Sequence, residues 1–300
     1  MSEKVIADKI YETHFEDYKD KYPDWFRMKR TDDGILELNF HRDGDAFRWS
    51  IDAHSALVDI LHDINNDWSN EVLILTGTGD DFLGQIDASN WAWHGYNTPY
   101  DWYKGYQVMY KRQYQELRAW MDLDIPTIGA INGAVILHPE LSLIHDIVLI
   151  TPKTTISQMH AAGLHIVPGD GCNTFWNELL GPNRANYYQL TGAVIDAQKM
   201  LDWGIAGEIV EENKLIDRAY ELADQCFMQA NPWQRRLTHS VLNQHWRLAF
   251  ERDLRFDLAH ETLGCMVKGT IGTSEVEGEL SAEDWIKQTN TDSAMMRGEK

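Results

Sequence analysis

The chain has 300 residues, of which 43% are hydrophobic, and it carries a formal net charge of −20 at pH 7. This length and apolar content are sufficient for one buried core. The acidic charge opposes binding to nucleic acid or to an anionic membrane surface, because both partners need a basic face.

Cysteine and histidine spacing argues against disulfides and metals. Cys172, Cys226 and Cys265 form no CxxC pair, so neither a disulfide framework nor a thiolate metal site is predicted. The histidines form no HxxxH or HExxH motif. No apolar run has the length of a signal peptide or a membrane span. We therefore expect a cytoplasmic protein without a metal or other cofactor.

The first half of the chain alternates strand and helix patterns. Residues 34–40 alternate like a strand, and residues 52–64 show helical spacing with Asp52 as the predicted N-cap. Residues 72–76 form the continuous apolar run that is typical of a buried parallel strand. Strand, helix and strand within about forty residues predict a βαβ unit and hence an α/β fold.

An aromatic segment follows between residues 91 and 114. The spacing of Tyr103, Tyr106, Tyr110 and Tyr114 predicts a helix that packs these rings into the core. Trp91 and Trp93 precede that helix, and they are candidates for the apolar wall of a substrate pocket.

The central stretch runs from residue 127 to residue 150. A strand-like run over 127–131 ends in the turn signal Asn132-Gly133, and His138-Pro139 then opens a short helix before the next strand. His138 is therefore placed at a strand-to-helix turn. Such turns at the carboxyl end of a strand are where α/β proteins place chemistry.

The remaining chain is largely helical after residue 214, and its last thirty residues are polar. We predict an N-terminal extension (1–28), a core (29–212), a C-terminal helical region (213–270) and a polar tail (271–300).

Three motifs resemble the enoyl-CoA hydratase (crotonase) superfamily in order and spacing. They are Gly77-Thr-Gly-Asp-Asp-Phe-Leu-Gly-Gln-Ile-Asp87, Ala130-Ile-Asn-Gly133 and Ile166-Val-Pro-Gly-Asp-Gly171. The chain departs from the usual member by carrying Leu137-His138-Pro139 in place of Gly-Gly-Gly, and the two glutamates of the hydratases are absent. The His-Pro-Glu turn is similar to the 6-oxocamphor hydrolase branch, which hydrolyses cyclic β-diketones. The resemblance implies a crotonase fold, a ββα-repeat spiral, with a C-terminal helical region that forms a trimer or a dimer of trimers.

The resemblance also implies where an oxyanion would bind. Crotonases use two backbone N–H groups, which here correspond to Ile86 and His138. Because Pro139 lacks an N–H, the side chain of His138 is the natural replacement donor. Asp87 is expected to be a turn residue.

Several further site residues follow from the same branch. His160 and Asp170 match its His-Asp pair, in which the histidine activates water, although His165 in the same loop is an alternative base. Trp49 and His54 match a substrate-binding Trp and a supporting His. Glu261 matches a catalytic Glu on a helix that would have to fold back over the pocket.

These residues predict a hydrolase that cleaves a carbon–carbon bond of a cyclic, alicyclic β-diketone by a retro-Claisen reaction without coenzyme A. The first alternative is a crotonase that acts on a CoA thioester. The second is a catalytically silent scaffold that acts by oligomeric binding.

Overall fold

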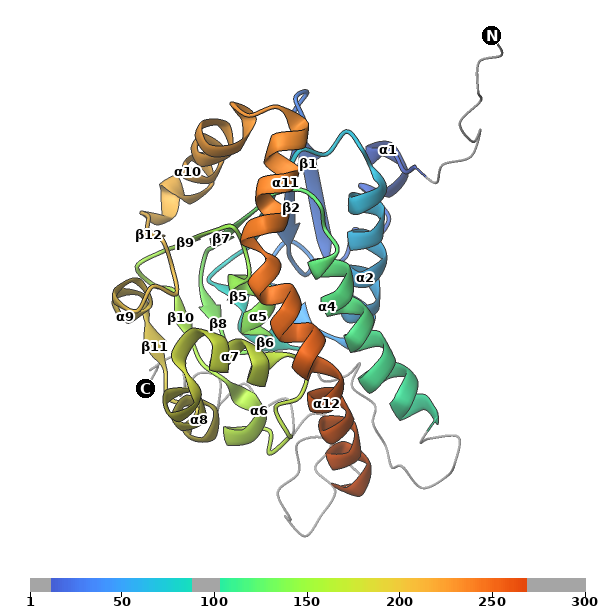
Figure 1. The fold of residues 1–300 in the computed structure, drawn as a ribbon, viewed down its shortest axis with the longest axis vertical. Helices are drawn as coiled ribbons and strands as arrows, with labels where there is room; N and C mark the ends of the chain where they lie inside the picture. The colour runs from blue at the N-terminus through green and yellow to red at the C-terminus, as the bar shows by residue number, and fades with distance from the viewer. Residues whose placement is uncertain (1–11, 88–102, 269–300) are drawn as a thin grey trace.

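The computed structural model describes residues 12–87 and 103–268, and it confirms the α/β fold (Figure 1). The largest sheet has six strands in the order β1-β2-β4-β7-β9-β12. β1 is antiparallel to β2, and the other neighbours are parallel. The strands are Phe26–Arg30 (β1), Ile35–Phe40 (β2), Val72–Gly77 (β4), Thr127–Ile131 (β7), Ile147–Ile150 (β9) and Glu208–Ile209 (β12).

Two smaller sheets are built from short strands. One has the order β11-β10-β8-β5, and the other pairs β3 with β6. After each of β2, β4, β7 and β9, the chain adds a short strand to a smaller sheet and returns through a helix. This order is the predicted ββα repeat. The short strands are Arg48–Trp49 (β3), Asp81–Leu83 (β5), Gln85–Ile86 (β6), Ala134–Val135 (β8), Thr155–Ile156 (β10) and Ile195–Asp196 (β11).

Helices cover the sheets and end in a long C-terminal helix, which lies beside α4 (Figure 1). Before β9 they are Phe15–Tyr18 (α1), Ile51–Asn66 (α2), the π-helix Tyr106–Arg112 (η2), Gln113–Met121 (α4) and Pro139–Leu143 (α5). After β10 they are Met159–Ala162 (α6), Cys172–Leu180 (α7), Pro182–Thr191 (α8), Ala197–Asp202 (α9), Glu212–Lys214 (η3), Leu215–Leu222 (α10), Ala223–Met228 (η4), Pro232–Leu242 (α11) and Gln244–Lys268 (α12).

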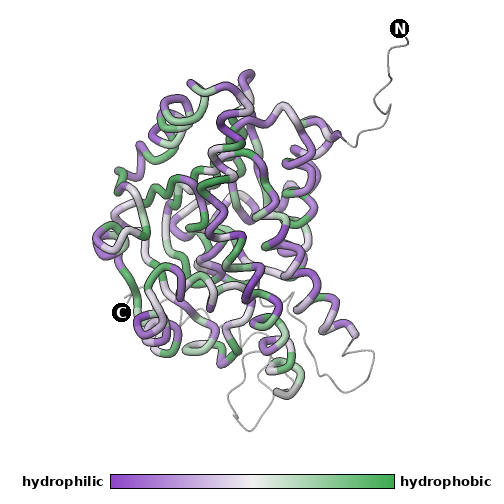
Figure 2. Tube along the Cα trace, viewed as in Figure 1, coloured by the Kyte–Doolittle hydropathy of each residue, from purple (hydrophilic) through white to green (hydrophobic). Residues whose placement is uncertain are grey.

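The large sheet is buried on both faces, which explains its continuous apolar strands. In β4, Val72 and Ile74 pack with α10 and η4, whereas Leu73 and Leu75 face the main core. Successive strand residues point to opposite faces, so a strand between two layers needs apolar residues at every position. Figure 2 shows hydrophobic residues along the central strands and hydrophilic ones on the outer helices.

Two local predictions were wrong. The N-cap of α2 is Ser50, whose side chain accepts a hydrogen bond from the Ala53 N–H, and not Asp52. Tyr103 and Tyr106 are exposed at 59% and 48%, whereas Tyr110 and Tyr114 do pack against the core. Tyr103 and Tyr106 lie at the amino-terminal end of this helical segment, one to two turns before the tyrosines that reach the core, and the Tyr106 ring stacks on that of Tyr110 with centroids 5.4 Å apart.

The predicted N-terminal extension lies partly outside the described residues, and the predicted polar tail lies wholly outside them. From residue 12 onward, the chain packs onto the body: Tyr18 is buried, and its hydroxyl donates to the Asp67 carboxylate at 3.0 Å. Among the described helices, none combines the length and the apolar character that a membrane crossing requires.

Candidate active site

The His138 turn has the backbone geometry of a functional site. After β7, Gly133 passes so close to Asp80 that a Cβ atom would lie 1.8 Å from the Asp80 carbonyl oxygen. His138 then adopts a left-handed conformation with φ of 44°, and Pro139 opens α5. A residue with a side chain costs about 1–3 kcal/mol in this region of φ and ψ, and such strain gathers at active sites. The structure thus explains why glycine usually occupies this turn in crotonases.

A pocket with about 380 Å³ of empty space lies over this turn. Besides Trp49, its described lining has five apolar and five polar side chains. Its described lining consists of Trp49, Ile86, Met109, Gln113, Leu137, His138, His160, Leu164, Ile166, Asp170 and Glu261. The predicted wall residues Trp91 and Trp93 lie outside the described residues. An apolar pocket with a few convergent polar groups is the usual form of a small-molecule site.

Asp170 is the centre of the polar groups. Its Oδ2 atom lies 2.9 Å from Nε2 of His160 and 3.5 Å from Nδ1 of His138, and its Oδ1 atom accepts from the Cys172 thiol at 2.9 Å. The structure therefore pairs Asp170 with His160, whereas His165 is exposed. Burial opposes the charge of Asp170, but His160 and His138 outweigh it and hold the pKa of this carboxyl below its usual range.

His160 itself has partners on both ring nitrogens. Nε2 pairs with Asp170, and Nδ1 lies within hydrogen-bond distance of the Gln158 amide nitrogen. A base needs a nitrogen that can take a proton from water. The role of His160 as that base stays a prediction, and its geometry points to another acceptor.

His138 is an imidazolium in this setting. Burial, the largest influence, lowers the pKa of His138, but the charges of Asp170 and Glu140 outweigh it and raise the pKa to about 9. The Nδ1 atom lies 2.8 Å from the Glu140 carboxylate, and burial raises the pKa of Glu140 as well. A charged donor in an apolar pocket is suited to stabilise a developing oxyanion.

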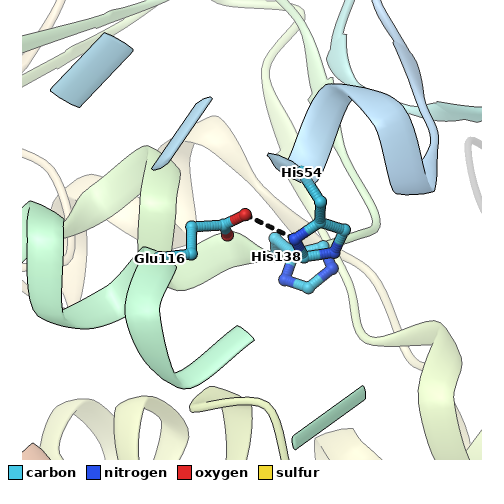
Figure 3. Close-up of side chains that lie close together, drawn as sticks. All are labelled: His54, Glu116 and His138. Carbon is cyan, nitrogen blue, oxygen red and sulfur yellow. Dashed lines mark hydrogen bonds and ion pairs between the residues drawn. The ribbon is translucent and has the colours of Figure 1, made fainter. Parts of the chain in front are cut away.

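Trp49 of β3 and His54 of α2 approach the same turn. Figure 3 shows His54 beside His138, with a hydrogen bond from the His54 ring to Glu116. The Trp49 ring centroid is 4.5 Å from that of His138 and 4.2 Å from that of His54. His54 is hydrogen bonded through Nδ1 to Glu116 of α4. Burial lowers the pKa of His54, so this ring is biased towards its neutral form, although Glu116 opposes the shift.

Glu261 and Gln113 each present a buried oxygen to the pocket that has no hydrogen-bond partner among residues 12–87 and 103–268. Glu261 is 2% exposed, its Oε2 atom is unpaired, and α12 carries it over the pocket as predicted. Gln113 is 5% exposed, and its Oε1 atom is also unpaired. Burial raises the pKa of Glu261 well above its usual value, and the Asp170 charge adds to the shift. Both atoms are free to bind water or a ligand.

Four polar residues of the site were not identified from sequence. Glu140 was visible only as part of the His-Pro-Glu turn, and Gln158 stands two residues before His160. Gln113 and Glu116 lie on α4, where a polar residue in a helix looks like a solvated one. No sequence signal separates these two from surface residues.

Some of the same side chains resemble metal ligand sets. Among the described residues, His54, Glu116 and His138 place one ligand atom each within 4.8 Å of one another, and two further groups surround Asp170. In the structure these side chains pair with one another: His54 with Glu116, His138 with Glu140, and Asp170 with His160 and with the Cys172 thiol. A metal ion would have to replace these contacts, and its ligands would have to be deprotonated.

Comparison with known sequences decides the family. Residues 30–262 match the family described as enoyl-CoA hydratase/isomerase. The chain belongs to this family, the crotonases. Its curated relatives include a carnitinyl-CoA dehydratase of Proteus mirabilis, 31% identical over 183 residues, which are 59% of this chain and 66% of that protein. A carnitinyl-CoA dehydratase of Citrobacter koseri is 36% identical over 105 residues, 35% of this chain and 40% of that protein. The chain thus spans less than two thirds of these relatives.

Solved structures confirm the crotonase fold. A β-diketone hydrolase from the cyanobacterium Anabaena sp. PCC 7120, bound to (S)-3-oxocyclohexyl acetic acid, is 29% identical with a TM-score of 0.76, over 87% of this chain and 99% of that one. An enoyl-CoA hydratase/isomerase from Mycobacterium paratuberculosis has a TM-score of 0.71 at 20% identity, over 90% of this chain and 98% of that one. The second likeness establishes the fold alone.

Proposed function

We propose that this crotonase hydrolyses the carbon–carbon bond between the two carbonyl groups of a cyclic β-diketone, without coenzyme A, and releases a keto acid. The observation that carries this proposal is the charged His138 side chain beside Trp49 in an apolar pocket. Retro-Claisen cleavage expels an enolate, and an imidazolium is a strong hydrogen-bond donor to an enolate oxygen.

The proposed reaction begins with water near the carboxyl groups of Asp170 and Glu261. Ionised Glu261 accepts a proton through its unpaired Oε2 atom, and the resulting hydroxide attacks one carbonyl carbon. A raised pKa suits this role, because it makes the Glu261 carboxylate a stronger base than an ordinary glutamate. The Asp170–His160 pair holds the water in place.

The tetrahedral intermediate then collapses and the carbon–carbon bond breaks. Its electron pair passes into the enolate, whose oxygen accepts hydrogen bonds from His138 and from the Trp49 indole. Neutral Glu261 returns its proton to the enolate carbon, so that water is consumed and the base is restored. The apolar lining by residues such as Leu137, Leu164 and Ile166 supports an alicyclic substrate.

Likeness to the Anabaena β-diketone hydrolase supports the proposal. That protein is bound to a compound with a ketone and a carboxylic acid, the two groups that hydrolysis of a cyclic diketone creates. The carnitinyl-CoA dehydratase relatives favour a second candidate, a crotonase that acts on a CoA thioester. This alternative requires the pocket to admit an acyl thioester beside His138.

We also propose that α11 and α12 form a contact between copies of the chain, as a trimer or a dimer of trimers. These helices expose large apolar side chains along their length: Trp233, Leu237, Val241, Leu248, Phe256 and Leu263. Exposed apolar surface of this kind usually marks an interface. The cytoplasmic location remains a prediction.

A direct assay separates the two candidate activities. The purified chain is incubated in parallel with cyclic β-diketones of several ring sizes and with acyl-CoA and enoyl-CoA thioesters. Acid release from a diketone that depends on His138 supports the proposal. Turnover of thioesters with no acid from any diketone would instead establish the second candidate.

A further inference from the structure

Gln158 bridges two buried rings behind the pocket. Its amide oxygen lies 3.0 Å from the indole Nε1 of Trp176 on α7, and its amide nitrogen faces Nδ1 of His160 on α6. The side chains of Gln158 and Trp176 are fully buried. No solvent competes for these hydrogen bonds, so their donors and acceptors must match.

The direction of each hydrogen bond follows from Trp176. An indole N–H can only donate, so the Gln158 atom beside it must be the oxygen. The amide nitrogen then faces His160, and it can only donate as well. Nδ1 of His160 must therefore be an unprotonated acceptor. The single proton of the neutral ring lies on Nε2, where it is donated to Asp170 at 2.9 Å.

We propose that Gln158, oriented by Trp176, is a positioning residue that fixes His160 as the neutral Nε2–H tautomer. His160 then acts as a hydrogen-bond donor to Asp170 and not as the base that takes a proton from water. The catalytic half of this inference rests on the proposed function, whereas the tautomer does not depend on it.

The arrangement also decides which histidine of the pocket is charged. The rings of His138 and His160 have centroids 5.9 Å apart, so two imidazolium ions there would repel each other. A second proton on His160 would have to sit on Nδ1, against the amide N–H of Gln158. Of these two histidines, His138 is therefore the one that carries the positive charge, beside Asp170 and Glu140. Among the carboxyl groups in the described lining of the pocket, Glu261 is then the one with an unpaired oxygen that can accept the proton of water.

The decisive variant is Gln158→Glu, which keeps the shape of the side chain but removes its N–H donor. One oxygen of the new carboxylate still accepts a hydrogen bond from Trp176. The other oxygen can only accept, so Nδ1 of His160 must carry a proton to pair with it. We expect His160 to become doubly protonated, the pKa of His138 to fall, and kcat for the diketone to drop at least about tenfold. Gln234→Glu on the exposed face of α11 is the matched control, and it should change none of these.

Nitrogen-15 NMR of the histidine rings measures the tautomer without any substrate. In the wild-type chain, we expect Nδ1 of His160 to have the chemical shift of an unprotonated ring nitrogen. Trp176→Phe removes the donor that orients the amide, and it should produce a mixture of tautomers. It serves as the second variant in case Gln158→Glu does not fold.

The outcomes separate the two proposals. A protonated Nδ1 in the wild-type chain overturns the fixed tautomer, even if the chain hydrolyses diketones. A His160 spectrum that Gln158→Glu and Trp176→Phe leave unchanged overturns the role of Gln158. An unprotonated Nδ1 in a chain that hydrolyses no diketone supports the tautomer and overturns the proposed function, together with the role of His160 in it.

Discussion

The charge on His138 can be tested by replacing this residue with glutamine. His138→Gln keeps a side chain of similar length with an N–H donor, but it cannot carry a positive charge. The rise in pKa from 6.5 to about 9 corresponds to about 3 kcal/mol by which the folded protein favours the imidazolium.

This preference has a defined effect on stability. A histidine whose pKa is higher in the folded chain than in the unfolded chain stabilises the fold fully below pH 6.5 and loses that contribution as the pH rises towards 9. We expect the free energy of unfolding of the wild type to fall by about 3 kcal/mol over this window, relative to His138→Gln. Urea unfolding at a series of pH values measures the difference.

The same variant should lower kcat for the diketone by at least about tenfold, since a hydrogen bond from a charged donor is roughly twice as strong as one from a neutral amide. The wild-type rate should also fall with a pKa of about 9 as His138 loses its proton. His62→Gln, at an exposed position on α2, is the matched control. If the wild type and His138→Gln lose stability in parallel between pH 6.5 and 9, or if NMR titrates His138 near 6.5, the reasoning about its charge is refuted.

Three further predictions follow from the pocket. Glu261→Gln should lower kcat by about 100-fold or more with little change in KM. It should also abolish the rise in rate with pH that ionisation of Glu261 produces in the wild type. A variant whose rate still rises with pH in this way would exclude Glu261 as the base. Trp49→Phe keeps an aromatic ring but removes the indole N–H, so kcat in steady-state kinetics should fall by about 100-fold. An unchanged urea unfolding transition would show that the fold is intact. Treatment with a chelator followed by gel filtration should leave diketone hydrolysis unchanged, and activity restored only by added metal would contradict the hydrogen-bonded interpretation of the His54, Glu116 and His138 group.

The sequence predicted those parts of the site that depend on local motifs. The turn at His138 follows from turn chemistry and apolar periodicity within a few residues. The pairing of His160 with Asp170 and the ββα order were implied by the family resemblance, which itself depends on short motifs. The family motifs extended these predictions to Trp49 and to Glu261, which lies more than two hundred residues further along the chain.

The rest of the site depends on contacts between distant segments. Glu116 meets His54 only because α4 packs beside α2, and Trp176 of α7 meets Gln158, the residue before α6, only in the folded chain. Neither pairing has a local signal, and both decide which histidine nitrogens carry protons. The tyrosine spacing failed for a related reason, since periodicity predicts a shared helix face but not how far along the helix the core extends, and Tyr103 and Tyr106 lie beyond its end.

The most direct test of the proposed hydrolysis is mass spectrometry of the product formed in water labelled with oxygen-18. The purified chain is given a bicyclic β-diketone that cannot enolise, in buffer free of coenzyme A, with His138→Gln and His160→Ala as controls. Our account predicts a keto acid that carries one solvent oxygen in its new carboxyl group, at a rate that His138→Gln sharply reduces. A chain that leaves every diketone intact while it converts acyl-CoA thioesters would contradict it.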